Sequence, residues 1–151
     1  MNIHEILVPF DFGDPALHAL AYAKGLADRF GSSLHLLHVV PNPYEPSTYL
    51  PLPADAPGAY YLPQSVIEGF LKDAENRLEH VLPSAERQSF RARTFVKVGD
   101  PRQEIVDHAA SEGVDLIVMG THGRTGASHL FLGSVAEKVV RAAPCPVLTV
   151  R

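Results

Sequence analysis

Short apolar runs alternate along the chain with segments whose apolar residues recur at helical spacing. Four runs are predicted as strands from their apolar and β-branched composition: 4–10, 32–40, 114–120 and 146–150. The run 32–40 is mostly apolar, as expected for a parallel strand covered on both faces, and 114–120 is the most apolar of the four. The run 89–98 instead alternates apolar and polar residues, which is typical of an edge strand with one wetter face. The pattern therefore predicts five strands.

Helical spacing and cap signals predict a helix between each pair of consecutive strands. The predicted starts are Asp14 with Pro15, Ser65 with Glu68, Asp100 and Pro101 with Gln103, and Ser134 with Glu137. Five strands with four intervening helices predict an α/β fold with a parallel sheet, because parallel neighbours need crossover connections. Ligands of such sheets bind beyond the carboxyl ends of the strands, where the strand order reverses. Function is therefore expected in the segments that follow strands.

Composition and charge narrow the class of protein. The length of 151 residues suits a single domain, expected to span 1–151, and an apolar fraction of 46% is typical of a globular chain. The net charge of −4 offers no basic surface, so no nucleic-acid partner is expected. No run is long enough to cross a bilayer and no leader precedes the first strand, so no membrane partner and a cytoplasmic location are expected. The single cysteine, Cys145, cannot form an internal disulfide.

One segment, 41–64, interrupts the alternation of strands and helices. It holds seven of the 13 prolines and four of the five tyrosines, and it is longer than most loops in compact domains. A structured or semi-ordered insertion without chemistry is favoured over a lid or an interaction surface.

The stretch GTHGRTGASHLFLGS (120–134) carries the candidate chemistry. Gly120 directly follows an apolar strand, Gly123 comes three residues later, and Gly133 and Ser134 precede a predicted helix. This spacing fits neither the Walker loop nor the dinucleotide fingerprint. Each glycine taken singly is compatible with a turn, and Ser134 with a helix cap, yet a helix start at the sheet edge also favours an anion. His122 and Arg124 add donors to the same loop.

Two further residue types outside this loop bear on function. Asp11 ends the first strand, and because Asp14 is the predicted cap, its carboxylate is spare for a sugar hydroxyl or a base amine. The alternative is a solvated loop acid. His35 and His38 lie three apart on a strand, which predicts opposite faces, and no metal-ligand spacing is found. No metal site made by protein side chains alone is predicted.

Together these motifs resemble the universal stress protein family over essentially the whole chain. The resemblance rests on the spacing of Gly120, Gly123, Gly133 and Ser134, on ILVPFD in the first strand, on HVV in the second and on PCPVLTV at the end. It implies a five-stranded Rossmann-like sheet ordered 3-2-1-4-5 with helices on both faces. Members with this glycine pattern bind ATP, usually with a divalent cation, so the resemblance implies ATP together with Mg or Mn as the ligand. After the strand-end aspartate the family often reads Gly-Ser, whereas this chain has Phe12, Gly13 and Asp14.

The resemblance also implies which residues form the ATP site. Those implied around the base and ribose are Pro9, Asp11, Val39, Met119 and Gly120. Those implied at the phosphates are Gly123, Gly133, Ser134 and Val135, with Arg124 as an additional charge partner. Similar proteins pair through the last strand, so a homodimer through 146–150 is expected.

Three hypotheses for function follow. The first is an ATP-binding sensor or regulator in the stress response with at most slow hydrolysis, because no Walker lysine or water-orienting base is evident. The second is a nucleotide-free dimeric module of the same fold whose Pro/Tyr-rich segment recognises a protein. The third, weaker one is a nucleotidyl-transfer enzyme built on the same sheet.

Overall fold

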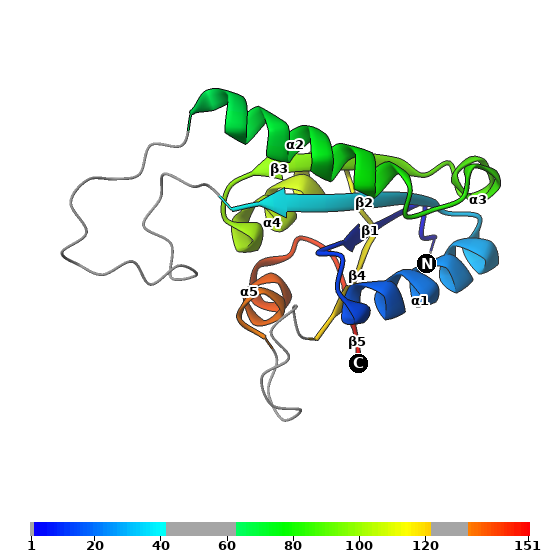
Figure 1. Cartoon of the computed structure of the whole chain (residues 1–151). Helices are drawn as coiled ribbons and strands as arrows, with labels where there is room; N and C mark the ends of the chain where they lie inside the picture. Colours follow the sequence, from blue (N-terminus) through cyan, green and yellow to red (C-terminus); the bar gives the residue numbers. More distant parts are fainter. Residues whose placement is uncertain (1, 42–62, 122–132) are drawn as a thin grey trace.

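A computed structural model describes residues 2–41, 63–121 and 133–151, and it contains one parallel sheet in the order β3-β2-β1-β4-β5 (Figure 1). The strands are β1 (Glu5–Pro9), β2 (Ser33–Val40), β3 (Arg93–Val98), β4 (Leu116–Gly120) and β5 (Val147–Val150). The helices in the described residues are α1 (Asp14–Phe30), α2 (Gln64–Glu79), α3 (Ser84–Ser89), α4 (Pro101–Ser111) and α5 (Ser134–Ala142). The predicted fold class and strand order are confirmed.

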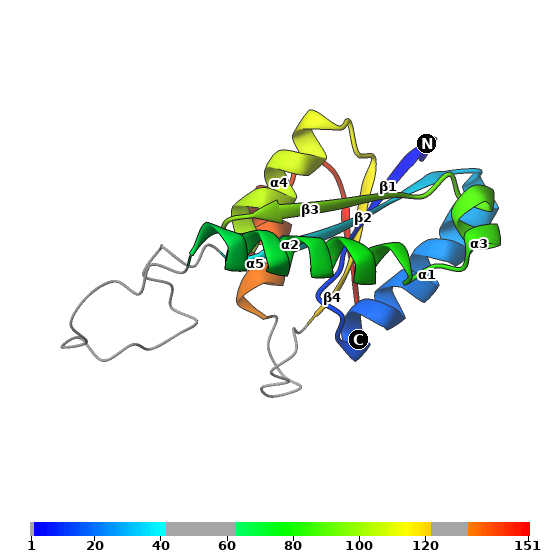
Figure 2. The ribbon, with the colours of Figure 1, turned by 45° about the horizontal axis from the view of Figure 1, so that its top comes forward.

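Helices cover both faces of the sheet, as Figure 2 shows for α1 and α4. Successive strand residues point to opposite faces, so the sheet divides the core into two clusters. The cluster under α1 and α2 includes Ile6, Val8, Leu34, Leu36, Ala19 and Leu78. The cluster under α4 and α5 includes Leu7, Leu37, Ile117, Ile105 and Val139. No helix in the described part of the chain is long and apolar enough to cross a membrane.

The element boundaries correct several details of the sequence prediction. Residues 84–89 form α3, so β3 begins at Arg93 rather than at Ser89. The position of β3 at the edge of the sheet is confirmed. Gly31 ends α1 in the left-handed conformation, with a φ of 69°, as predicted.

The predicted helix caps are correct at one helix and wrong at three. Asp100 caps α4 by accepting a hydrogen bond from the Arg102 N–H at 2.9 Å, and the Arg102 side chain holds the pKa of Asp100 below its usual value. The N-caps of α1, α2 and α5 are Gly13, Pro63 and Gly133, none of which forms a side-chain cap. At these three ends the helix begins one or more residues earlier than the capping signals predict.

Candidate functional site

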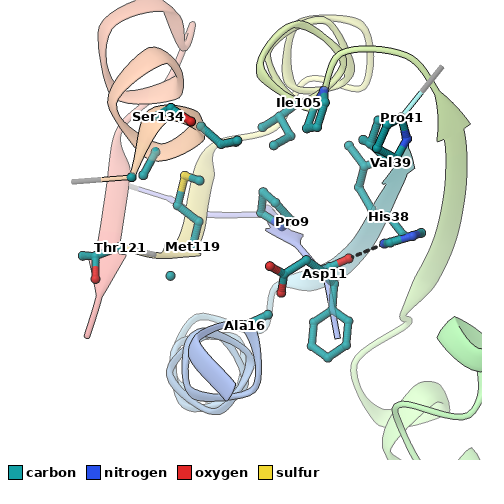
Figure 3. Close-up of a pocket in the computed structure, with 17 residues that line it drawn as sticks. Pro9, Asp11, Ala16, His38, Val39, Pro41, Ile105, Met119, Thr121 and Ser134 are labelled. Carbon is teal, nitrogen blue, oxygen red and sulfur yellow. Dashed lines mark hydrogen bonds between the residues drawn. The ribbon is translucent and has the colours of Figure 1, made fainter. Parts of the chain in front are cut away.

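A cavity of about 380 Å³ lies beyond the carboxyl ends of β1, β2 and β4, where the strand order reverses (Figure 3). Eight of the ten residues predicted for the ATP site line it: Pro9, Asp11, Val39, Met119, Gly120, Gly133, Ser134 and Val135. The other two, Gly123 and Arg124, lie outside the described residues. The fold thus brings together residues from three strands and the start of α5.

Thr121 and Gly133, the described residues on either side of 122–132, are hydrogen-bonded to each other. Gly133 donates its backbone N–H to the Thr121 carbonyl at 2.7 Å, and Thr121 donates its N–H to the Val150 carbonyl at 2.9 Å. The two ends of the glycine-rich stretch are therefore joined directly beside the cavity. The N–H of Gly133 is used in this closure, so Gly133 positions the helix start without offering a donor to a ligand.

The first turn of α5 offers backbone donors to the cavity. Ser134, Val135 and Ala136 are the first three residues of the helix, and all three line the cavity. The N–H groups of a helix's first turn have no partner within the helix, and the helix dipole adds positive potential there. This arrangement suits an anion such as a phosphate.

The capping role predicted for Ser134 is wrong. Gly133 is the N-cap, and Ser134 is the first helical residue, with an exposed side chain at the edge of the cavity. Helix capping therefore does not explain why this residue is a serine. The hydroxyl is placed where it can donate to a ligand oxygen.

Asp11 lies on the opposite side of the cavity from α5, with its carboxylate turned into the cavity (Figure 3). One carboxylate oxygen, Oδ1, accepts a hydrogen bond from the Gly13 N–H at 2.9 Å. Asp11 is therefore not the fully spare carboxylate that the sequence suggested. Its second oxygen still faces the cavity as an acceptor for a hydroxyl or an amine.

Gly120 has a packing role that the glycine pattern alone does not reveal. A Cβ at this position would lie 2.7 Å from Pro15 Cβ and 3.0 Å from the Pro15 carbonyl carbon. The end of β4 therefore packs against the first turn of α1 more closely than a side chain allows. Gly120 lines the cavity, but this contact is sufficient to explain why the residue is glycine.

The apolar wall of the cavity includes residues that the sequence prediction missed. Ile105 and Pro101 of α4 line it together with Leu37, Val39 and Met119. Apolar walls with a few placed polar groups are typical of small-molecule sites. Pro101 comes just after the third strand, and the carboxyl ends of parallel strands meet at one edge of the sheet. This position in the sequence could have indicated that Pro101 lies near the cavity.

The histidines do not form a site at this cavity. His38 lines it and donates from Nδ1 to the Phe10 carbonyl at 2.7 Å, whereas His35 lies on the other face of β2, beside His108 of α4. The prediction of opposite faces is confirmed. Among the residues that the structure describes, no group of three or more His, Cys, Asp or Glu is placed to hold a metal ion.

The reversed strand order with a cavity at the reversal defines a Rossmann-like α/β protein. A model of the universal stress protein family matches residues 2–151, and the chain belongs to that family. A universal stress protein of Methanocaldococcus jannaschii is 35% identical over 147 residues, covering 97% of this chain and 81% of that protein.

Solved structures agree with this assignment. The universal stress protein UspA from Lactobacillus plantarum has a TM-score of 0.72 at 28% identity, covering 100% of this chain and 99% of that one. The universal stress protein from Archaeoglobus fulgidus in complex with dAMP has a TM-score of 0.60 at 22% identity, covering 100% of both chains. At that identity the likeness to the Archaeoglobus protein extends to the fold alone.

Proposed function

We propose that this universal stress protein binds ATP at the cavity and acts as a nucleotide-dependent sensor or regulator. The observation that carries the proposal is the meeting, in one cavity, of an apolar wall, the Asp11 carboxylate and the first turn of α5. An adenine nucleotide has a matching set of parts: a flat base, ribose hydroxyls and an anionic phosphate chain. The dAMP bound in the Archaeoglobus structure is a ligand of this chemical class.

Each part of the nucleotide has a proposed partner in the cavity. The base lies against Val39 and Met119, and the ribose hydroxyls or the base amine donate to Asp11. The phosphates lie at the N–H groups and the hydroxyl at the start of α5, with Gly123 and Arg124 proposed as further contacts from the loop. A divalent cation, Mg²⁺ or Mn²⁺, is proposed to be held by the phosphates rather than by side chains.

The composition of the cavity favours binding over rapid phosphoryl transfer. Its described lining includes one carboxylate, Asp11, and one imidazole, His38, but no lysine or arginine. Phosphoryl transfer depends on positioned positive charge and a group that orients the nucleophile. We therefore propose slow hydrolysis at most.

The decisive experiment is to denature freshly purified protein and identify any released nucleotide by mass. Calorimetric titration of nucleotide-free protein with ATP, ADP and AMP, each with and without Mg²⁺, then ranks the ligands. Released adenine nucleotide and saturable ATP binding are expected. No nucleotide and no binding would refute the proposal and favour the nucleotide-free interaction module.

We also propose that the chain forms a homodimer through β5. This strand is at the edge of the sheet. The Pro146 and Val150 carbonyls accept from Ile117 in β4 and from Thr121 just after it, so alternation turns the Thr149 N–H outward. Thr149→Pro removes that donor and is expected to give monomers in light scattering, while Thr149→Ala stays dimeric. A wild-type monomer, or a dimeric proline variant, would refute this arrangement.

A further inference from the structure

Phe12, next to Asp11, has an unusual backbone conformation. Its φ is 65°, and Arg91 is the only other non-glycine residue with a positive φ in the described part of the chain. This left-handed region is unfavourable for a bulky residue because Cβ crowds the backbone. A conformation of this kind persists only where surrounding contacts hold it.

Three side chains hold the Phe12 ring. The guanidinium carbon of Arg77 lies 4.1 Å from the ring centroid, and the ring of His38 lies 4.8 Å away, centroid to centroid. Phe10 contacts the Phe12 ring edge-on at 5.4 Å. His38 is held in turn by the Phe10 carbonyl, so the ring is clamped between α2 on one side and β2 on the other.

The conformation of Phe12 determines the geometry of the Asp11 turn. The hydrogen bond from the Gly13 N–H to Asp11 Oδ1, 2.9 Å long, spans Phe12. The torsions of Phe12 orient the Gly13 N–H, so with Asp11 held where it is, a change in the φ or ψ of Phe12 would move this N–H away from its 2.9 Å contact with Oδ1. The carboxylate would then lose the contact that fixes its orientation toward the cavity.

We propose that Phe12, clamped between Arg77 and His38, is a positioning residue that holds the Asp11 carboxylate in place for a hydrogen-bond donor of the bound nucleotide. The proposal rests on the function proposed above and adds to it that α2 supports the ligand site through Arg77. It gives a role to Phe12, which follows Asp11 at a position where the family often has glycine. A purely structural role for the ring would affect stability without affecting Asp11.

Arg77→Ala tests the clamp with little risk to the fold, because the Arg77 side chain is 49% exposed and its ion pair with Asp73 is 3.9 Å long. Lys72→Ala is the matched control, since Lys72 is an exposed cation on the same helix. In ligand-free protein, NMR hydrogen exchange of the Gly13 amide is expected to accelerate in Arg77→Ala and to stay unchanged in Lys72→Ala. Unchanged Gly13 exchange in Arg77→Ala would overturn the proposal.

Affinity for Mg-ATP, measured by calorimetry, tests whether the clamp acts through Asp11. Arg77→Ala is expected to weaken binding about fivefold, within the range of a cation–π contact, and Arg77→Lys to recover part of the loss. In an Asp11→Ala background the same change is expected to have no effect, because contacting residues couple. An equal loss in both backgrounds, or unchanged affinity with a lowered melting temperature, would overturn the proposal.

Phe12→Gly provides a second, independent variant. Glycine adopts the left-handed conformation freely but has no ring to be clamped, so faster Gly13 exchange and weaker Mg-ATP binding are expected. Unchanged values would show that the ring does not position Asp11. If the wild type binds no ATP, the proposed function fails, and Gly13 exchange alone decides whether the clamp holds Asp11.

Discussion

The two ends of the sheet are both rich in polar side chains, but they use them differently. At the carboxyl end, Asp11, Ser134 and the first turn of α5 face a cavity. At the amino end, His35 and His108 are fully buried and pair with each other, His35 Nδ1 to His108 Nε2 at 3.2 Å. The first set of groups lines an open cavity, whereas the second is satisfied within the protein.

Nearby charges complete the network at the amino end. His35 Nε2 lies 2.9 Å from Glu5 Oε2, and its Nδ1 faces the Nε2 of His108, so both ring nitrogens of His35 have partners within the protein. Arg93 lies against His35 and pairs with Glu5 and Glu112, each at 3.6 Å. Asp115 accepts from the N–H groups of His4 and Glu5 at 2.7 and 3.0 Å.

A cluster of titratable residues is therefore not in itself a functional site. Histidines and carboxylates gather at the amino end, yet their partners are other residues of the chain. The carboxyl end has fewer such groups, but α5 begins there and its first-turn N–H groups have no partner within the helix. Four changes, in decreasing order of expected effect, test this distinction.

Lowering the pH is expected to destabilise the protein through the histidine pair at the amino end of the sheet. Burial, followed by the nearby His35, lowers the pKa of His108 from 6.5 to about 4, and Lys97, Glu112 and Arg93 also face it. Because the folded state keeps His108 neutral, the unfolded state binds the proton more readily. Stability is therefore full above pH 6.5 and falls between pH 6.5 and about 4, by on the order of 3 kcal/mol for His108.

Urea unfolding across this pH range measures the loss. His108→Gln keeps a hydrogen-bonding side chain without a titrating ring, and it is expected to flatten the pH profile. A variant profile as steep as that of the wild type would show that the titration lies elsewhere.

At the carboxyl end, Ser134→Asp is expected to separate binding from stability. A carboxylate at the first residue of α5 favours the helix dipole but repels phosphate, so Mg-ATP affinity should fall about thirtyfold, or ~2 kcal/mol. Calorimetry measures the affinity, and the melting temperature should not fall. Ser134→Asn, similar in size but neutral, is the control. An Asp variant that binds as tightly as Asn would place the phosphates away from α5.

Gly120→Ala tests whether close packing supports the carboxyl end. The added Cβ would meet Pro15 at 2.7 Å, so a loss of about 1.5 kcal/mol in unfolding free energy is expected. Gly25→Ala is the control, because a Cβ there meets nothing within 4 Å and alanine favours a helix interior by up to about 1 kcal/mol. If both changes stabilise the protein, the approach of β4 to α1 is looser than described.

Asp115→Ala is expected to have the smallest effect and to leave the cavity untouched. Its hydrogen bonds to Glu5 and His4 hold the pKa of Asp115 below its usual value. Losing these bonds is expected to cost about 1 kcal/mol of stability, read from urea unfolding. Mg-ATP affinity should be unchanged, and a weaker affinity would mean that the two ends of the sheet are coupled.

Most of the fold was predictable from local sequence because strands and helices have different hydrophobic periods. Strand alternation predicted that His35 and His38 lie on opposite faces of β2, and this prediction is confirmed. The cap of α4 at Asp100 was also correct, since its carboxylate meets an N–H two residues away. Such features depend on neighbours in the chain, which the sequence displays.

The candidate site was only partly predictable. The residues implied by the family resemblance meet at one cavity wherever the structure describes them, but their individual roles differ from expectation. Ser134 is not a cap, Asp11 has one oxygen engaged by Gly13, and Gly120 is explained by Pro15. The contributions of Pro101 and Ile105 were missed because α4 reaches the cavity only once the sheet is assembled.

Local sequence was thus sufficient for the alternation of strands and helices, except for the short helix α3, and for the glycine-rich stretch before α5. It did not reveal the contact of Arg77 with Phe12, the closure of Thr121 onto Gly133, or the burial of the His35 and His108 pair. Those features join residues from separate elements, and their energies exist only when packing brings the elements together. Periodicity and turn chemistry act within a few residues, whereas the shape of a cavity depends on contacts across the whole sheet.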